Sequence, residues 1–183
     1  AELVRMINTS TEINDRPCAF RYPRGTGLGS ILPSINEKIE IGKSKIIKEG
    51  KKLAILNFGA RLNETLKAAE NLLKKGVPIT VVDARFAKPL DENLIWQLAT
   101  THEAIMTIEE GSIGGFGSHV VNFLTKKGLM DSNLKFRSLT LPDIFIDQDT
   151  PDKMYKVANL DSVSIEEKVL DLLNSNIVLK KQN

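Results

Sequence analysis

The chain has 183 residues, of which 42% are hydrophobic and 26% are charged, a composition typical of one globular domain or slightly more. Its 25 lysines and arginines nearly balance its 23 aspartates and glutamates, so the net charge of +2 favours neither nucleic acid nor an anionic membrane as a partner. A single cysteine and two histidines exclude an intrachain disulfide and argue against a zinc site built on those residues. Because no secretory signal or bilayer-length apolar run is visible, we expect a cytoplasmic protein.

The first 33 residues predict a helix, a short extended run and a glycine-rich turn. Residues 1–13 have helical spacing with no capping residue before them, and the sequence starts at Ala1 instead of methionine. We therefore expect a chain cut from a longer protein. Residues 18–22 are β-prone, and the glycines of residues 23–29 are typical of a turn.

The next two segments, residues 39–47 and 53–58, predict strands, and the polar residues 49–52 favour a tight turn between them. We expect the two strands to form a hairpin at one edge of a sheet. The lysines on this hairpin would protect the edge from aggregation, a role that we favour over RNA binding. These residues are Lys43, Lys45, Lys48, Lys51 and Lys52.

Strands and helices alternate from residue 61 onward. Helices are predicted over residues 61–75, 91–101 and 114–127, with two more starting at Thr150 and Ser164, and strands over residues 78–83, 104–108 and 134–141. Such βαβ units form a parallel sheet with crossover helices. The predicted fold class is therefore α/β, a mostly parallel open sheet with helices on both faces and an edge hairpin.

The glycine-rich loop at residues 109–119 follows a predicted strand and opens a helix, where open α/β sheets bind ligands. It lacks the third glycine of a dinucleotide-binding fingerprint, and the chain has no P-loop. We therefore favour a structural role for these glycines, which let the loop turn and the helix approach the sheet. An anion or regulator site and a subunit interface are the alternatives.

Two further segments carry charges suited to ligands. Arg21 and Arg24 lie three residues apart beside glycines, and arginine forks suit phosphate or carboxylate, although surface ion pairs are the simpler interpretation. Asp83 and Arg85 lie between a strand and a helix and could contact a ligand. Asp91 is predicted to cap that helix.

Single residues offer weaker signals. His102 and His119 have no nucleophile elbow nearby and are expected to pack or cap. Cys18 has apolar neighbours, so we expect a buried, inert thiol. Trp96 is expected in the core or at an interface.

Five motifs of this chain occur in an order that resembles the family of 1-deoxy-D-xylulose-5-phosphate synthases. They are residues 21–25 (RYPRG), 53–59 (LAILNFG), 88–91 (KPLD), 108–118 (IEEGSIGGFGS) and 141–146 (LPDIFI). The resemblance covers nearly the whole chain. It implies that residues 1–33 end a pyrimidine-binding domain and that residues 34–183 form a transketolase-type C-terminal domain.

The resemblance also implies an activity for the parent enzyme, which would be a homodimer of three-domain chains. Such a transferase uses thiamine diphosphate and Mg²⁺ to decarboxylate pyruvate and join the product to glyceraldehyde 3-phosphate. It yields 1-deoxy-D-xylulose 5-phosphate and CO₂ and feeds isoprenoid, thiamine and pyridoxal synthesis. The cofactor supplies the electron sink, and the protein positions it.

Only one functional residue is carried over by the resemblance. Arg24 matches the arginine that binds the phosphate of glyceraldehyde 3-phosphate, whereas Arg21 is assigned local structure alone. The chain lacks the family's Gly-Asp-Gly…Asn motif, its pyrimidine-activating glutamate and its N-terminal histidines. We therefore expect no catalytic, cofactor or metal residues and no activity from this chain alone.

Two alternatives stay open at this point. One is another thiamine-dependent enzyme such as transketolase, and the other is a free-standing regulatory or interaction domain of this fold. Residues 21–25 and 141–146 favour the synthase, because these motifs separate its family from transketolase proper and from the β subunits of 2-oxoacid dehydrogenases.

Overall fold

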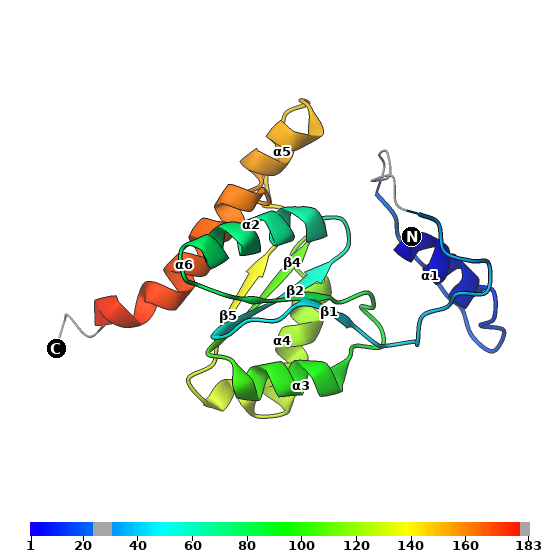
Figure 1. Ribbon diagram of the computed structural model, residues 1–183, viewed down its shortest axis with the longest axis horizontal. Helices are drawn as coiled ribbons and strands as arrows, with labels where there is room; N and C mark the ends of the chain where they lie inside the picture. Colours follow the sequence, from blue (N-terminus) through cyan, green and yellow to red (C-terminus); the bar gives the residue numbers. More distant parts are fainter. Residues whose placement is uncertain (24–30, 180–183) are drawn as a thin grey trace.

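The computed structural model describes residues 1–23 and 31–179, and its centre is a five-stranded sheet (Figure 1). The strands are β1 (Lys45–Lys48), β2 (Leu53–Phe58), β3 (Thr80–Asp83), β4 (Ala104–Glu109) and β5 (Lys135–Leu139). Their order across the sheet is β1-β3-β2-β4-β5. All pairs are parallel except β1 with β3. The predicted mostly parallel open sheet is therefore confirmed.

Helices cover both faces of this sheet, as predicted (Figure 1). One face carries α2 (Leu62–Lys74) and α6 (Ser162–Leu179), and the other carries α3 (Glu92–Thr101) and α4 (Phe116–Lys126). The short elements are α1 (Glu2–Ser10), a 3₁₀ turn at Leu129–Asp131 and α5 (Pro151–Val157). Within the described ranges, no helix is both long and apolar enough to cross a membrane.

The central strands explain why the two helical layers form. In β2, Leu53 and Ile55 pack toward α2 and α6, whereas Ala54 and Leu56 pack toward α3 and α4. A parallel strand covered on both faces has a continuous apolar sequence instead of an alternating one. Each face of the sheet thus has its own apolar core.

The predicted hairpin is wrong, although β1 does lie at the edge of the sheet. β1 pairs with β3, which lies between β1 and β2. The connection after β1 crosses the start of β3, where the Lys51 amide donates to the Pro78 carbonyl at 2.9 Å. A Cβ atom on Gly50 would lie 2.2 Å from the carbonyl carbon of Ile79, so only glycine fits this crossing.

The first part of the chain is set apart from the sheet (Figure 1). We call residues 1–23 and 31–40 the N-terminal segment. Its helix α1 contacts residues 37–39 of the same segment, because the amide of Ile39 donates to Thr9 Oγ1 at 2.9 Å and Arg5 pairs with Glu37 at 2.8 Å. The β-prone residues 18–22 form no strand. The segment reaches the body through polar contacts such as the ion pair of Glu2 with Arg85, at 2.8 Å.

Candidate functional site

The carboxyl ends of β2 and β4 form the point of the fold best placed for a site. The chain leaves β2 toward β3 on one side and later returns to β4 on the other side. Open α/β sheets bind ligands at such a topological switch point. The loops that follow these two strands begin at Gly59 and Glu110. They bring together residues from distant parts of the sequence.

A half-buried ion pair occupies this switch point. Arg61, the N-cap residue of α2, places Nε 2.7 Å from Glu110 Oε1. The Arg61 and Glu110 side chains are only 15% and 20% exposed, so solvent screens this pair less than a surface pair. Thr65 fixes the start of α2 by donating to Asn57 Oδ1 at 2.9 Å, at the end of β2. Thr65 also donates to the Arg61 carbonyl at 3.1 Å, so the backbone position of Arg61 is tied to the end of β2.

Tyr155 of α5 covers the same pair. Its ring centroid lies 3.5 Å from Arg61 Cζ, a close cation–π contact. Burial, together with the hydrogen bond and charge of Glu110, raises the pKa of the Tyr155 hydroxyl. The phenol therefore stays protonated at neutral pH beside the Glu110 carboxylate. We call Arg61, Glu110 and Tyr155 the switch-point cluster.

The glycine-rich loop after β4 is ordered by the neighbouring carboxylate. Glu109 is 4% exposed and accepts the amides of Phe116 and Gly117, each at 2.9 Å, at the start of α4. A Cβ atom on Gly115 would lie 2.3 Å from Glu109 Oε2. The glycines therefore leave room for a carboxylate that caps α4. This geometry agrees with the structural role predicted for the loop.

The two predicted arginines have different outcomes. Arg21 Nη2 donates to the Glu110 carbonyl oxygen at 3.4 Å, so the structure brings Arg21 to the switch point. Arg24 lies outside the described residues, and its phosphate role stays a prediction. The predicted boundary between residues 1–33 and 34–183 likewise stays a prediction.

The segment after β3 contains a second charged group, beside α1. Asp83 is 9% exposed, and burial raises its pKa against the lowering effects of the Arg85 amide and charge. Arg85 has a φ of +56° and places Nη2 2.8 Å from Glu2 Oε2. This left-handed backbone conformation is uncommon outside glycine. Arg85 thus joins α1 to the body.

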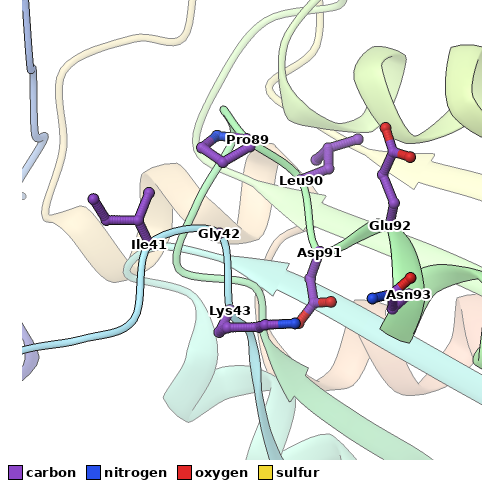
Figure 2. A pocket seen from close by; sticks show the side chains of 8 residues that line it. All are labelled: Ile41, Gly42, Lys43, Pro89, Leu90, Asp91, Glu92 and Asn93. Carbon is purple, nitrogen blue, oxygen red and sulfur yellow. The ribbon is translucent and has the colours of Figure 1, made fainter. Parts of the chain in front are cut away.

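Asp91 caps α3 as predicted. Its Oδ1 accepts the amide of Leu94 at 3.2 Å, and its Oδ2 accepts the amide of Ser44 at 2.9 Å. A cavity of about 300 Å³ lies beside this cap (Figure 2). It is lined by Ile41, Gly42, Lys43, Pro89, Leu90, Asp91, Glu92 and Asn93. Both oxygens of the Asp91 carboxylate accept backbone amides in this cap. Asp91 therefore serves to cap α3, and we do not assign it a role as a ligand in this cavity.

A larger cavity, about 550 Å³ in volume, lies between α4 and β5. It is lined by Glu109, by hydroxyl and amide side chains such as Ser118 and Asn122, and by the apolar Ile113 and Val121. The Glu109 carboxylate is already occupied by amides of α4. The cavity therefore adds no reactive group to the switch point.

The remaining candidates are structural or exposed. His102 caps α3 and lies 2.8 Å from Thr80 Oγ1 through Nε2, and burial lowers its pKa. His119 lies half-buried on α4.

Cys18 is exposed, so the predicted buried thiol is wrong, because no strand forms around it. Trp96 is 53% exposed and does not belong to the core. Within the part of the chain that the structure describes, no three His, Cys, Asp or Glu side chains could hold a metal ion.

Sequence reasoning missed two members of the switch-point cluster. Arg61 follows a strand, and Tyr155 lies in a short helix much later in the chain. No spacing pattern links them, since only the crossover of the chain brings them together. The one available signal for Arg61 was its position just after a predicted strand, because ligands of open α/β sheets bind where strands end.

Two comparisons place the chain among known proteins. The family "Transketolase, C-terminal domain" matches residues 42–165. A solved structure described as "Split gene transketolase, inactive beta4 tetramer" is 27% identical, with a TM-score of 0.69. That similarity covers 79% of this chain but 46% of the other, so this chain spans less than half of that relative's length.

Proposed function

The chain belongs to the transketolase C-terminal domain family, and from this premise we propose that it is part of a 1-deoxy-D-xylulose-5-phosphate synthase. In this proposal the assembled enzyme condenses pyruvate with glyceraldehyde 3-phosphate, and residues 34–183 act as its C-terminal domain. Residues 1–33 end the domain that binds the aminopyrimidine. The enzyme is a homodimer that supplies isoprenoid and thiamine synthesis.

The observation that carries this proposal is the convergence of the motifs of the resemblance. Residues 53–59 end at the switch point, and residues 108–118 begin there. Arg21, from the first motif, donates to the carbonyl of Glu110, and Leu141, from the last motif, donates its amide to Gly111 at 2.9 Å. Four of the five motifs thus meet at one edge of the sheet, which supports a shared function.

The proposal assigns thiamine diphosphate and Mg²⁺ to other parts of the assembled enzyme. The described residues near the switch point do not fit these groups, because their carboxylates already accept amides or pair with an arginine. When bound, thiamine diphosphate supplies the electron sink. The inactive state named for the split transketolase supports our expectation that this chain alone has no activity.

In the proposal, this chain contributes phosphate recognition through Arg24. A guanidinium can donate two parallel hydrogen bonds to phosphate oxygens, which distinguishes a phosphorylated acceptor from its unphosphorylated analogue. Arg24→Ala in the assembled enzyme should raise the KM for glyceraldehyde 3-phosphate roughly 10- to 100-fold, the range that hydrogen bonds to charged groups support. The KM for pyruvate should stay unchanged. An equal effect on both substrates would contradict the phosphate role.

The second candidate function is transketolase activity, which the description of the split relative favours. A donor assay separates the two candidates. The assembled enzyme should release CO₂ from pyruvate in the presence of glyceraldehyde 3-phosphate and should not use a ketose phosphate as donor. The reverse result would favour a transketolase.

A further inference from the structure

The ring of His102 lies where α3 meets the chain crossing at the amino ends of the strands. His102 follows the last residue of α3, and its Nε2 lies 2.8 Å from the hydroxyl oxygen of Thr80, the first residue of β3. The same oxygen accepts the amide of Gly50 at 3.1 Å, in the connection between β1 and β2. Thr80 thus links the end of α3 to that connection. The link lies at the opposite edge of the sheet from the switch-point cluster, so its role is separate from the function proposed above.

The hydrogen bonds around His102 assign the protonation state of its ring. The Thr101 hydroxyl donates its one hydrogen to the Gln97 carbonyl at 2.7 Å, so its oxygen must accept from Nδ1 of His102, 2.9 Å away. Within the described residues, the hydrogen of the Thr80 hydroxyl has Nε2 of His102 as its one acceptor. Nδ1 therefore carries a hydrogen and Nε2 accepts one, which is the neutral Nδ1–H tautomer.

A second proton on the ring would disturb this arrangement. An Nε2–H group would point at an oxygen that already accepts the Gly50 amide, and the Thr80 hydroxyl would keep a hydrogen with no acceptor. Thr80 is 3% exposed, and a buried donor without an acceptor is costly. The C-terminus of a helix by itself favours a charged histidine, so the hydrogen bonds of the ring oppose the effect of its position.

The charges around the ring do not explain a preference for the neutral form. Among the described residues, the elements next to His102 carry the charges of Lys48, Glu49, Lys51, Lys52, Glu103 and Asp131. Lys48 is half-buried and the others are exposed. The pKa of His102 is instead lowered by burial, against the raising effect of a hydrogen bond with the Leu98 backbone. The response of this ring to pH therefore depends on burial and hydrogen bonds.

We propose that His102, Thr80 and Gly50 form a proton-sensitive clasp, which holds the connection between β1 and β2 against α3 at neutral pH and releases it when the ring gains a proton. Release would loosen a crossing in which only glycine fits between the two chain segments. β1 pairs with β3 alone in the described sheet, so the edge of the sheet depends most on this connection. Acid should therefore open this edge while β2 and β4 stay paired. Histidine suits such a device, because its charge changes near physiological pH.

Nitrogen-15 NMR of the imidazole rings tests the state of the clasp directly. His102 should show the Nδ1–H tautomer at neutral pH, and its titration midpoint should lie below that of a histidine in an unfolded chain. Thr80→Val removes the hydroxyl at similar volume and should raise this midpoint. Thr100→Val is the matched control, because the Thr100 hydroxyl contacts backbone carbonyls of α3 and not the ring. An Nε2–H tautomer, or a midpoint that Thr80→Val leaves unchanged, would overturn the proposal.

Amide hydrogen exchange tests the release of the connection. The protection factor of the Gly50 amide should fall roughly 3-fold or more between about pH 7.5 and pH 5, as the clasp opens locally. The amide of Ile55, in the middle of β2, should keep its protection. In His102→Gln, whose side chain does not titrate, the protection of Gly50 should no longer depend on pH. Constant protection in the parent, or a fall that persists in His102→Gln, would overturn the proposal.

The stability of the chain should change with pH in the matching direction. Because the pKa of His102 is lowered in the folded state, the unfolded chain binds this proton more tightly. Stability from the clasp is thus complete above the pKa of the unfolded chain and is lost as the pH falls toward the folded pKa. In urea unfolding, His102→Gln should differ from the parent less at pH 5 than at pH 7.5, and the contribution of Asp83 cancels in this difference. A difference that stays constant or grows toward acid pH would contradict the clasp.

Discussion

The sheet with its helices and the N-terminal segment are held in place by different forces. The body buries two apolar layers, one on each face of the sheet. The N-terminal segment instead contacts the body through charged groups, with Glu2 against Arg85 and Arg21 against the Glu110 carbonyl. Apolar burial stabilises roughly in proportion to area, whereas a partly buried ion pair such as Glu2–Arg85 contributes little, because the cost of removing its charges from water offsets their attraction. The body should therefore unfold as one unit, and the N-terminal segment should detach at a much lower cost.

The largest effect should come from the apolar core of the body. Leu72 of α2 is fully buried, so Leu72→Ala should lower the free energy of unfolding by about 2–5 kcal/mol, through lost burial and a residual cavity. Urea denaturation followed by circular dichroism measures the change. Leu73→Ala is the matched control, since Leu73 is 49% exposed on the same helix and should cost far less. Equal losses in both variants would contradict the description of this core.

A somewhat smaller effect should come from the close contact between α4 and the sheet. A Cβ atom on Gly117 would lie 2.3 Å from Ser138 Oγ and 2.7 Å from Thr107 Oγ1. Gly117→Ala should therefore destabilise the body by about 1–3 kcal/mol, as overpacking does. Combining it with Ser138→Ala should recover part of the loss. If thermal unfolding shows no destabilisation in Gly117→Ala, α4 lies farther from the sheet than described.

The pH dependence of stability should reflect Asp83, which lies where the body meets the N-terminal segment. Burial raises the pKa of Asp83 in the folded state, so the folded chain binds this proton more tightly than the unfolded chain does. Stability from this group is thus present below its ordinary pKa and is lost as the pH rises through the folded pKa. In Asp83→Asn, urea unfolding between pH 4 and pH 7 should show a weaker decline with pH than in the parent. An unchanged slope would contradict the assignment.

The smallest change in global stability should come from the contact between the two regions. Glu2→Gln removes the charge that pairs with the mostly buried Arg85. Because α1 can then leave the body and expose Arg85 to water, the free energy of global unfolding should change by less than about 1 kcal/mol. Limited proteolysis within residues 1–23 should nevertheless become faster. Glu12→Gln is the control, because Glu12 pairs with Lys38 inside the N-terminal segment. A large loss of global stability in Glu2→Gln would show that the two regions unfold together.

The same contrast explains how much the sequence could predict. Helices α2, α3 and α4 and strands β2 to β5 follow from periodicity, because each buries a face whose spacing is visible locally. The partner of β1 is not visible in this way, since β1 is adjacent in sequence to β2 but pairs with β3. Local sequence patterns thus predict where a strand lies but not which strand it pairs with.

The site was less predictable than the fold for a related reason. The Asp91 cap and the glycines around Glu109 depend on residues close in sequence, so their roles could be foreseen. The contact of Arg61 with Glu110 and Tyr155 joins three distant segments, and no local rule indicates it. The exposure of Cys18 was missed because apolar neighbours predict burial only where a partner surface exists.

The crossing of Gly50 over the start of β3 has a consequence for the order in which the chain folds. β1 leaves the ribosome before β2, yet its hydrogen-bonding partner is complete only when residue 83 has emerged. Until then β1 has no neighbour, and its two lysines, Lys45 and Lys48, discourage pairing with another nascent chain. The unit of β2, α2 and β3 contains shorter-range contacts and should assemble first. The first strand in the sequence is thus expected to be among the last to join the sheet.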